Sequence, residues 1–286
     1  MVVGHSGRNR RTGSHGGDLG DSGARERAGR NSILKNSSGY RPSNPRQSPR
    51  TRAVTLARPL LIIFDVDGVL VDTRGSFQRT TLQTVRLFTG KRVTRAELHR
   101  WKNRPGFNDD WKLSHVWIRS LGADYSYDEI KKRFMELYWG KNENGNVARE
   151  RWLLTKPMLR ELAKSAELAI FTGRTLHELN YTLDRNKVRN FFGTIVTVES
   201  VRKGKPDPEG LFTILNGHPA SSAVYVGDNV DDALAARAAR MPFVGVLPVR
   251  SEERRQRAVR LRELGALTIL DRVSNLLAWL NNLPKL

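Results

Sequence analysis

The sequence lacks cysteine, and it lacks any apolar run long enough to cross a membrane. Its 286 residues include no cysteine, which excludes disulfides, zinc–thiolate sites and thiol nucleophiles. No stretch of about 18 apolar residues is present, so we expect neither a membrane-spanning helix nor a membrane partner. The first 30 residues also lack the apolar core of a secretory signal peptide. The absence of cysteine is typical of a reducing compartment, and we expect a cytoplasmic protein.

Acidic residues are scarce relative to basic ones. The chain has 29 Asp and Glu against 49 Lys and Arg, a formal net charge of +20. The excess is densest in residues 1–58, which hold 12 basic and 3 acidic residues. This Gly-, Ser- and Arg-rich segment has no apolar periodicity, so we predict that it is disordered. It could be a solvated extension without a function, an arm that binds nucleic acid or another polyanion, or a transit-like leader.

Short apolar runs alternate with segments of helical spacing from residue 60 onwards. The runs lie at residues 60–64, 168–171, 194–198, 223–226, 243–246 and 267–270. They are apolar throughout rather than at alternate positions, which is typical of strands buried on both faces of a parallel sheet. We therefore predict an α/β core of residues 59–74 and 153–286, with a Rossmann-like parallel sheet covered by helices on both faces.

The stretch between the first and second runs contains no convincing strand. Its helical spacing predicts an all-helical cap domain at residues 75–152, inserted after the first strand. Five of the six tryptophans fall here; they either form a small helical core, or one or two of them line a substrate pocket. The polar turn at residues 104–111 is either an ordinary link between helices or a loop that reaches the site and determines specificity.

Two aspartates follow the first predicted strand, in the segment Asp65-Val-Asp67-Gly68. Carboxylates at the end of a buried strand are costly unless a cation pairs with them. Gly68 allows the chain to turn sharply at this point. Taken alone, an Asp-x-Asp pair could also be a strand-end turn or a calcium loop.

Two later segments also follow predicted strands. Thr172 and Gly173 offer a hydroxyl and an accessible backbone N–H, and both groups suit a phosphate. Lys205 precedes Pro206, whose ring stiffens the backbone. Each segment alone has a simpler interpretation, a helix-capping turn for the first and a surface turn for the second.

Three more acids follow the strand predicted at residues 223–226. Asp228 ends this strand, and Asp231 and Asp232 lie in the first turn of the next predicted helix, where capping would suffice to explain one of them. Ligands of open α/β sheets bind at the carboxyl ends of the strands, so the acids, the hydroxyl and the lysine should converge. This inventory suits Mg²⁺ together with a phosphate group.

In this order, the four segments resemble the signature motifs of the haloacid dehalogenase-like superfamily, and in particular its phosphoglycolate phosphatase-like members. The resemblance covers about residues 60–282. It implies a magnesium-dependent phosphatase that hydrolyses a small phosphorylated metabolite through an aspartyl phosphate. Dehalogenating members typically lack an acid at the position of Asp67, so this residue favours phosphoryl transfer. A phosphomutase of the same fold and an inactive polyanion-binding protein are the alternatives.

The resemblance also implies catalytic roles. Asp65 is the nucleophile, and Asp67 is the general acid that protonates the leaving alcohol and then the base that activates water. The Thr172 hydroxyl and the Gly173 amide bind the phosphoryl oxygens. Lys205 neutralises charge between the nucleophile and the phosphate.

The resemblance implies a metal site as well. The ligands of Mg²⁺ are the carboxylates of Asp65 and Asp228 and the backbone carbonyl of Asp67. Asp232 is either a further ligand or a residue that anchors the ligands, and Asp231 is the alternative to Asp232. We expect a nucleic-acid partner only through the basic tail. The oligomeric state stays open.

Overall fold

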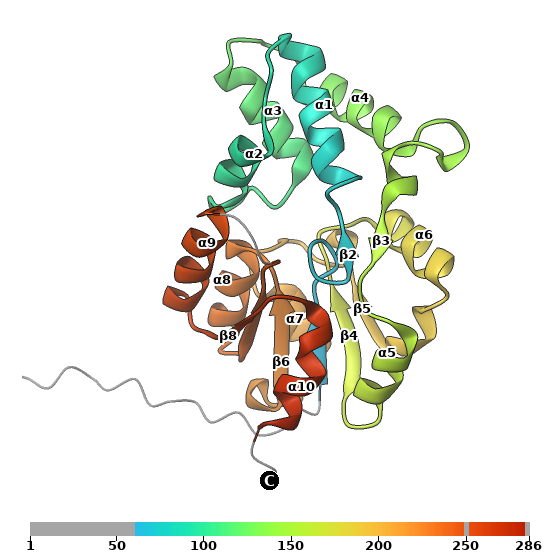
Figure 1. Ribbon diagram of the computed structural model, residues 1–286, viewed down its shortest axis with the longest axis vertical. Helices are drawn as coiled ribbons and strands as arrows, with labels where there is room; N and C mark the ends of the chain where they lie inside the picture. The colour runs from blue at the N-terminus through green and yellow to red at the C-terminus, as the bar shows by residue number, and fades with distance from the viewer. Residues whose placement is uncertain (1–60, 249–251, 284–286) are drawn as a thin grey trace, which may run out of the picture. The chain divides into compact units, whose positions relative to one another are not determined.

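A six-stranded parallel sheet forms the core of the α/β part of the described chain (Figure 1). The structure, a computed structural model, describes residues 61–248 and 252–283, so the predicted disorder of residues 1–58 lies outside the described residues. The strand order is β5-β4-β1-β6-β7-β8, and every neighbouring pair is parallel. The strands are β1 Leu61–Phe64, β4 Glu167–Phe171, β5 Thr194–Val196, β6 Ala223–Gly227, β7 Phe243–Val246 and β8 Ala266–Leu270. The predicted parallel α/β sheet is confirmed.

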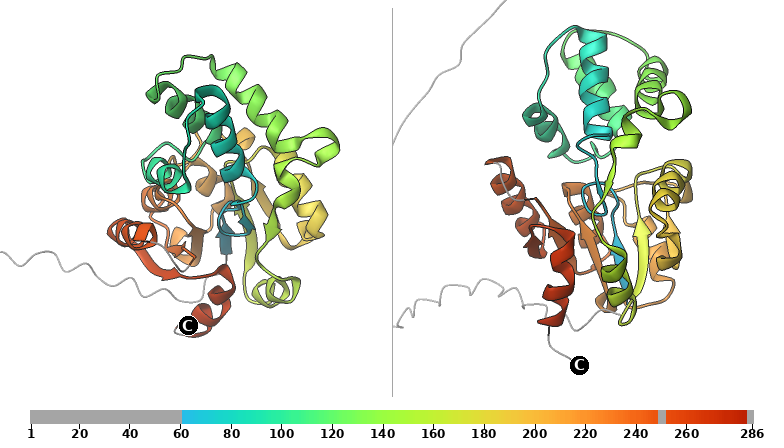
Figure 2. Two further views of the ribbon diagram at one scale, coloured as in Figure 1. Left: turned by 45° about the horizontal axis from the view of Figure 1, so that its top comes forward. Right: turned by 45° about the vertical axis from the view of Figure 1, so that its right-hand side comes forward.

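Helices cover both faces of the sheet (Figure 2). On β1, Ile62 and Phe64 face one apolar cluster, whereas Leu61 and Ile63 face the other. The first face is covered by α5 Lys156–Ala163, α6 Leu176–Asn186 and α10 Leu276–Asn281. The second is covered by α7 Glu209–Leu215, α8 Val230–Ala238 and α9 Glu252–Glu263. Burial on both sides explains why the strands are apolar throughout.

Four further helices follow the first strand and build an apolar cluster of their own. They are α1 Phe77–Thr89, α2 Arg95–Lys102, α3 Asp110–Ser120 and α4 Tyr127–Trp139. Capping boxes at Thr94 and Ser126 define the starts of α2 and α4. Trp101 and Trp117 pack in this cluster, which agrees with a structural role for the tryptophans. We propose that these helices form the cap.

A two-stranded antiparallel ladder joins the four helices to the sheet. It pairs β2 Val71–Asp72 with β3 Arg151–Trp152. The stretch 75–152, in which we expected no strand, therefore ends in one, because the chain enters and leaves the helical part along two neighbouring segments that pair. Short 3₁₀ turns complete the described chain, at Lys141–Glu143, Asn146–Arg149, Arg189–Phe191, Val198–Ser200, Ala220–Ser222 and Val273–Asn275.

Within residues 61–248 and 252–283, no helix has both the length and the apolar character that crossing a bilayer requires.

Candidate active site

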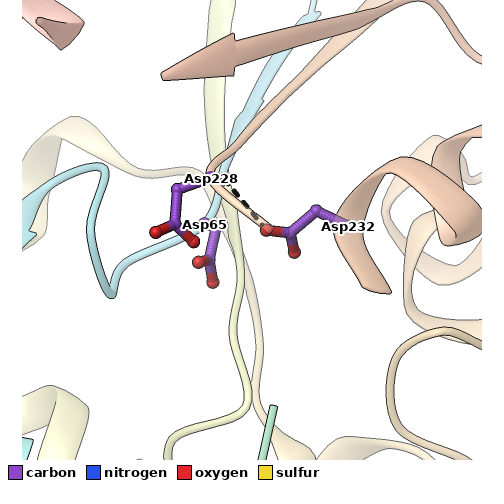
Figure 3. A group of neighbouring side chains, drawn as sticks. All are labelled: Asp65, Asp228 and Asp232. Atoms are coloured by element: carbon purple, nitrogen blue, oxygen red, sulfur yellow. Dashed lines mark hydrogen bonds between the residues drawn. The ribbon is translucent and has the colours of Figure 1, made fainter. Parts of the chain in front are cut away.

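Three aspartates meet at the carboxyl ends of two neighbouring strands. Asp65 follows β1, Asp228 follows β6, and Asp232 lies in the first turn of α8. One carboxylate oxygen from each lies within 4.8 Å of the others. In Figure 3 the Asp65 and Asp228 side chains lie side by side, and Asp232 points toward them from its helix. The parallel pairing of β1 with β6 brings these distant positions together.

A buried lysine joins two of these acids. Nζ of Lys205 lies 2.7 Å from Oδ1 of Asp65 and 2.8 Å from Oδ1 of Asp232. It also donates to the Tyr225 hydroxyl at 2.9 Å. The Lys205 side chain is only 1% exposed, so its charge is little screened by water. The structure thus connects three of the predicted site residues through one ammonium group.

The adjacent acids Asp231 and Asp232 point in different directions. Oδ1 of Asp232 accepts from Lys205 and from the Tyr225 hydroxyl, and its Oδ2 accepts from the backbone N–H groups of Asp228 and Asn229. Asp231 instead accepts the backbone N–H of Gly106 at 2.9 Å. Asp232 therefore faces the cluster and Asp231 does not, and the four donors to Asp232 suit a side chain that orients its neighbours.

Burial dominates the electrostatics of the cluster. Burial raises the pKa of Asp65 well above its usual range, although the charge of Lys205 acts to lower it. Burial also raises the pKa of Asp228, although the charge of Arg257 acts to lower it. Burial alone would lower the pKa of Lys205, but the carboxylates of Asp232 and Asp65 outweigh it and raise that pKa. Carboxylates that are costly to ionise here would be stabilised by a divalent cation.

The acid cluster fits a hard, oxygen-liganded cation such as Mg²⁺. Three carboxylates converge here. Among the described residues, two cationic side chains form ion pairs with them, Lys205 and Arg257, so the carboxylates outnumber the cations. Asp65 and Asp228 are the residues best placed to bind the ion, because Asp232 is already saturated with donors. Gly68, at φ +84°, packs directly against the Asp228 carboxylate, and a Cβ there would collide with it.

Asp67 forms part of a separate ion cluster. Arg174 donates from Nη2 to Oδ1 of Asp67 at 2.6 Å and to Oε1 of Glu150 at 2.7 Å. The Tyr138 hydroxyl also donates to Glu150, and the guanidinium lies 5.1 Å from the centroid of the Phe77 ring. Glu150 lies between the four helices and β3, and Phe77 begins α1. Arg174 therefore connects Asp67 to both segments that join the helices to the sheet.

Thr172 and Gly173 lie at the end of β4, close to the polar turn of residues 104–111. Thr172 is buried, and its hydroxyl accepts the backbone N–H of Arg174. A Cβ at Gly173 would lie 3.3 Å from Nδ2 of Asn108. Oδ1 of Asn108 accepts from Nδ2 of Asn229. The turn thus reaches the site, while Asp109 caps α3.

Sequence reasoning missed several charged residues near the acids. Lys102 pairs with Asp110 at 2.9 Å. Burial alone would lower the pKa of Lys102, but the carboxylates of Asp110, Asp67 and Asp228 raise it. Arg257 donates to the carbonyl oxygen of Asp228 at 2.6 Å. Helical spacing alone marks these residues as parts of polar faces, so only the tertiary structure identifies them as neighbours of the site.

Comparisons with known proteins show what this chain is similar to in sequence and in fold. The family described as "Haloacid dehalogenase-like hydrolase" matches residues 62–246, more than half of the chain. An imidazoleglycerol-phosphate dehydratase of Phytophthora nicotianae is 29% identical over 195 residues, 65% of this chain but only 43% of that protein. A phosphoglycolate phosphatase of Pseudomonas fluorescens is 26% identical over 66% of this chain and 69% of its own length. A haloacid dehalogenase-like protein of Agrobacterium tumefaciens matches at a TM-score of 0.61 and 20% identity, over 78% of this chain and 97% of its own.

Proposed function

The chain belongs to the haloacid dehalogenase-like hydrolases, and we propose that it is a magnesium-dependent phosphatase of a small phosphorylated metabolite, with Asp65 as its nucleophile. The observation that carries this proposal is the buried Asp65–Lys205 pair beside Asp228. An anionic nucleophile and a phosphate dianion repel each other unless positive charge lies between them. The similarity to a phosphoglycolate phosphatase supports the same class of substrate.

In the first step, a carboxylate oxygen of Asp65 attacks phosphorus. A bond forms between this oxygen and phosphorus, and the bond from phosphorus to the alcohol oxygen breaks. Asp67, in its protonated form, transfers its proton to the leaving oxygen, so an alcohol departs and Asp67 becomes a carboxylate. When bound, Mg²⁺ would supply positive charge that offsets the repulsion between the carboxylates and the phosphate.

In the second step, Asp67 accepts a proton from a water molecule that attacks the aspartyl phosphate. The bond from phosphorus to Asp65 breaks, inorganic phosphate leaves, and both aspartates return to their initial forms. The Thr172 hydroxyl and the Gly173 amide would bind the phosphoryl oxygens throughout, and Lys205 would neutralise their charge. Electrostatic stabilisation of this kind is strong in a site that excludes water.

Phosphate release is the direct test of the proposal. The full chain should release inorganic phosphate from p-nitrophenyl phosphate and from members of a panel of phosphorylated metabolites, phosphoglycolate among them, when Mg²⁺ is supplied. Release should stop when a chelator removes the metal and resume when Mg²⁺ returns in excess. A mutase would instead move the phosphoryl group without net release. Equal release with and without Mg²⁺ would contradict the proposal.

The Arg174 ion cluster predicts that Glu150 influences proton transfer by Asp67. In Glu150→Gln the Arg174 guanidinium would lose Glu150 as an ion-pair partner and keep only Asp67, so it would hold the Asp67 carboxyl in a less suitable position for proton transfer. We expect kcat for an alkyl phosphate, whose leaving group needs the proton, to fall about 10- to 100-fold, a part of the usual effect of general acid catalysis. For p-nitrophenyl phosphate, whose leaving group departs without protonation, kcat should fall much less.

Leaving-group dependence separates this role from a purely structural one. Glu143→Gln is the control, because Glu143 lies in the same connecting segment and is exposed. It should affect neither substrate. If Glu150→Gln slows both substrates equally, Glu150 supports the fold and does not assist Asp67.

A further inference from the structure

A large cavity adjoins the acid cluster on the side of Asp228. Its volume is about 1140 Å³, and it lies between α2 and the ends of β7 and β8. Gly68 and Asp228 form one wall, so the cavity touches the proposed metal site directly. Small-molecule sites typically measure roughly 300–1,000 Å³. The cavity therefore has room for much more than a phosphoglycolate-sized molecule.

One face of α2 lines the cavity with basic groups. Arg95, His99 and Lys102 follow one another at spacings of four and three residues, so they share a face of this helix. Arg95 and His99 line the cavity. Lys102 is close enough to Asp67 and Asp228 for their charges to raise its pKa. The basic face of α2 thus extends from the catalytic acids into the cavity.

The core contributes positive charge to the opposite wall. Arg257 and Arg272 line the cavity there. Arg257 is paired with Asp228, but within the described part of the chain neither Arg95 nor Arg272 has a carboxylate within ion-pair distance. Burial, followed by the charges of Arg257, Lys102 and Arg95, lowers the pKa of His99 to about 4. The acids that line the cavity, Asp72, Asp228 and Asp271, are each paired with an arginine of its wall. Arg95 and Arg272 therefore leave an excess of positive charge that an anion would offset.

We propose that the substrate carries a second phosphate group, and that this group binds in the cavity between Arg95 on α2 and Arg272 on the core. The inference rests on the proposed phosphatase function, because the first phosphate would lie at Asp65. Guanidinium groups suit phosphate, since their planar donors contact two oxygens at once. A bisphosphate would also contact both walls of the cavity, and its binding would therefore favour the arrangement in which α2 lies over the core.

Matched sugar phosphates test the proposal. With Mg²⁺ present, kcat/KM of the full chain should be at least about tenfold higher for fructose 1,6-bisphosphate than for fructose 1-phosphate or fructose 6-phosphate, as charge-assisted contacts to one more phosphate suggest. In the double variant Arg95→Gln/Arg272→Gln this ratio should fall to about threefold or less. Both residues are exposed, so the variant should fold. Arg100→Gln, at an exposed position on α2 outside the cavity, should leave the ratio unchanged.

A binding measurement separates failure of this proposal from failure of the proposed function. By calorimetry with the metal chelated, fructose 1,6-bisphosphate should bind at least about tenfold more tightly than either monophosphate, and the double variant should lose this difference. Absence of turnover with the binding difference intact would overturn the phosphatase function and support the cavity as the site of the second phosphate. Equal binding of bisphosphate and monophosphates would overturn the cavity proposal.

Inorganic phosphate distinguishes a substrate group from a separate anion. If the cavity binds the substrate's own second phosphate, inorganic phosphate should inhibit hydrolysis of p-nitrophenyl phosphate only by competition. A change in kcat that saturates with inorganic phosphate and disappears in Arg95→Gln/Arg272→Gln would assign the cavity to a free anion. That result would overturn the proposal that it binds part of the substrate.

Discussion

Asp65→Asn should reduce phosphatase activity to background, a loss of about 10⁴- to 10⁶-fold in kcat, which is the usual range when a catalytic nucleophile or its direct partner is removed. The amide keeps the shape of the side chain but is a poor nucleophile, so no aspartyl phosphate should form. Lys205 would still be held by Asp232 at 2.8 Å, so we expect the variant to fold. Measurements of phosphate release and of covalent phosphate by mass spectrometry check both points.

Asp67→Asn is the matched comparison, because it leaves the nucleophile intact. Turnover of alkyl phosphates should fall about 100- to 10,000-fold, the usual effect of losing a general acid. With p-nitrophenyl phosphate the first step should survive better than the attack of water. The phosphorylated protein should then accumulate, with the label on Asp65. If Asp65→Asn keeps substantial magnesium-dependent activity, attack by a metal-bound water would explain the chemistry better than a covalent step.

Lys205→Met should cost both activity and stability. Lys205 contacts Asp65 and Asp232, whose side chains are 3% and 0% exposed. Removing one partner of a buried ion pair typically lowers the free energy of unfolding by about 3–5 kcal/mol. Phosphatase activity should fall in parallel, because the charge between the nucleophile and the phosphate is lost. Chemical denaturation with the metal chelated measures the change in the free energy of unfolding, because bound Mg²⁺ would otherwise add to the stability of the folded state.

Two controls make this prediction specific. Lys203→Met, on the same loop and exposed, should change neither activity nor stability. Adding Asp232→Asn to Lys205→Met removes one unpaired buried charge, so it should restore part of the stability and none of the activity. A double variant no more stable than Lys205→Met would mean that packing, and not charge, explains the loss.

The stability deficit of Lys205→Met should also depend on pH. Burial raises the pKa of Asp65 in the folded state above its unfolded value, so ionisation of this group costs the folded state more as the pH rises. Removing Lys205 increases that cost, because the lysine is the cation that opposes the rise. The deficit should therefore be smaller below the folded-state pKa of Asp65, where the carboxyl is protonated in both proteins, and should grow as the pH rises through that pKa. A deficit that is independent of pH would contradict the electrostatic explanation.

Local patterns predicted much of the architecture and the neighbourhood of the site. Apolar runs such as residues 60–64 and 223–226 indicated buried parallel strands, and parallel strands place their carboxyl ends at one edge. For this reason the sequence predicts that Asp65, Lys205 and Asp228 lie close together. The turn at residues 104–111 left two interpretations, because its sequence does not show what lies opposite it.

The sequence by itself determined that strands and helices alternate along the core, that the sheet is parallel and that the acids converge, since these follow from periodicity and from positions at strand ends. Only the tertiary structure decided that Asp232 and not Asp231 faces Lys205, because neighbouring residues of a helix point about 100° apart and either could be the inner one. It alone also showed that Glu150 reaches Arg174, and that the basic face of α2 lies over a cavity beside Asp228. Such contacts join residues far apart in the chain, and they depend on how the elements pack together, which local sequence patterns do not record.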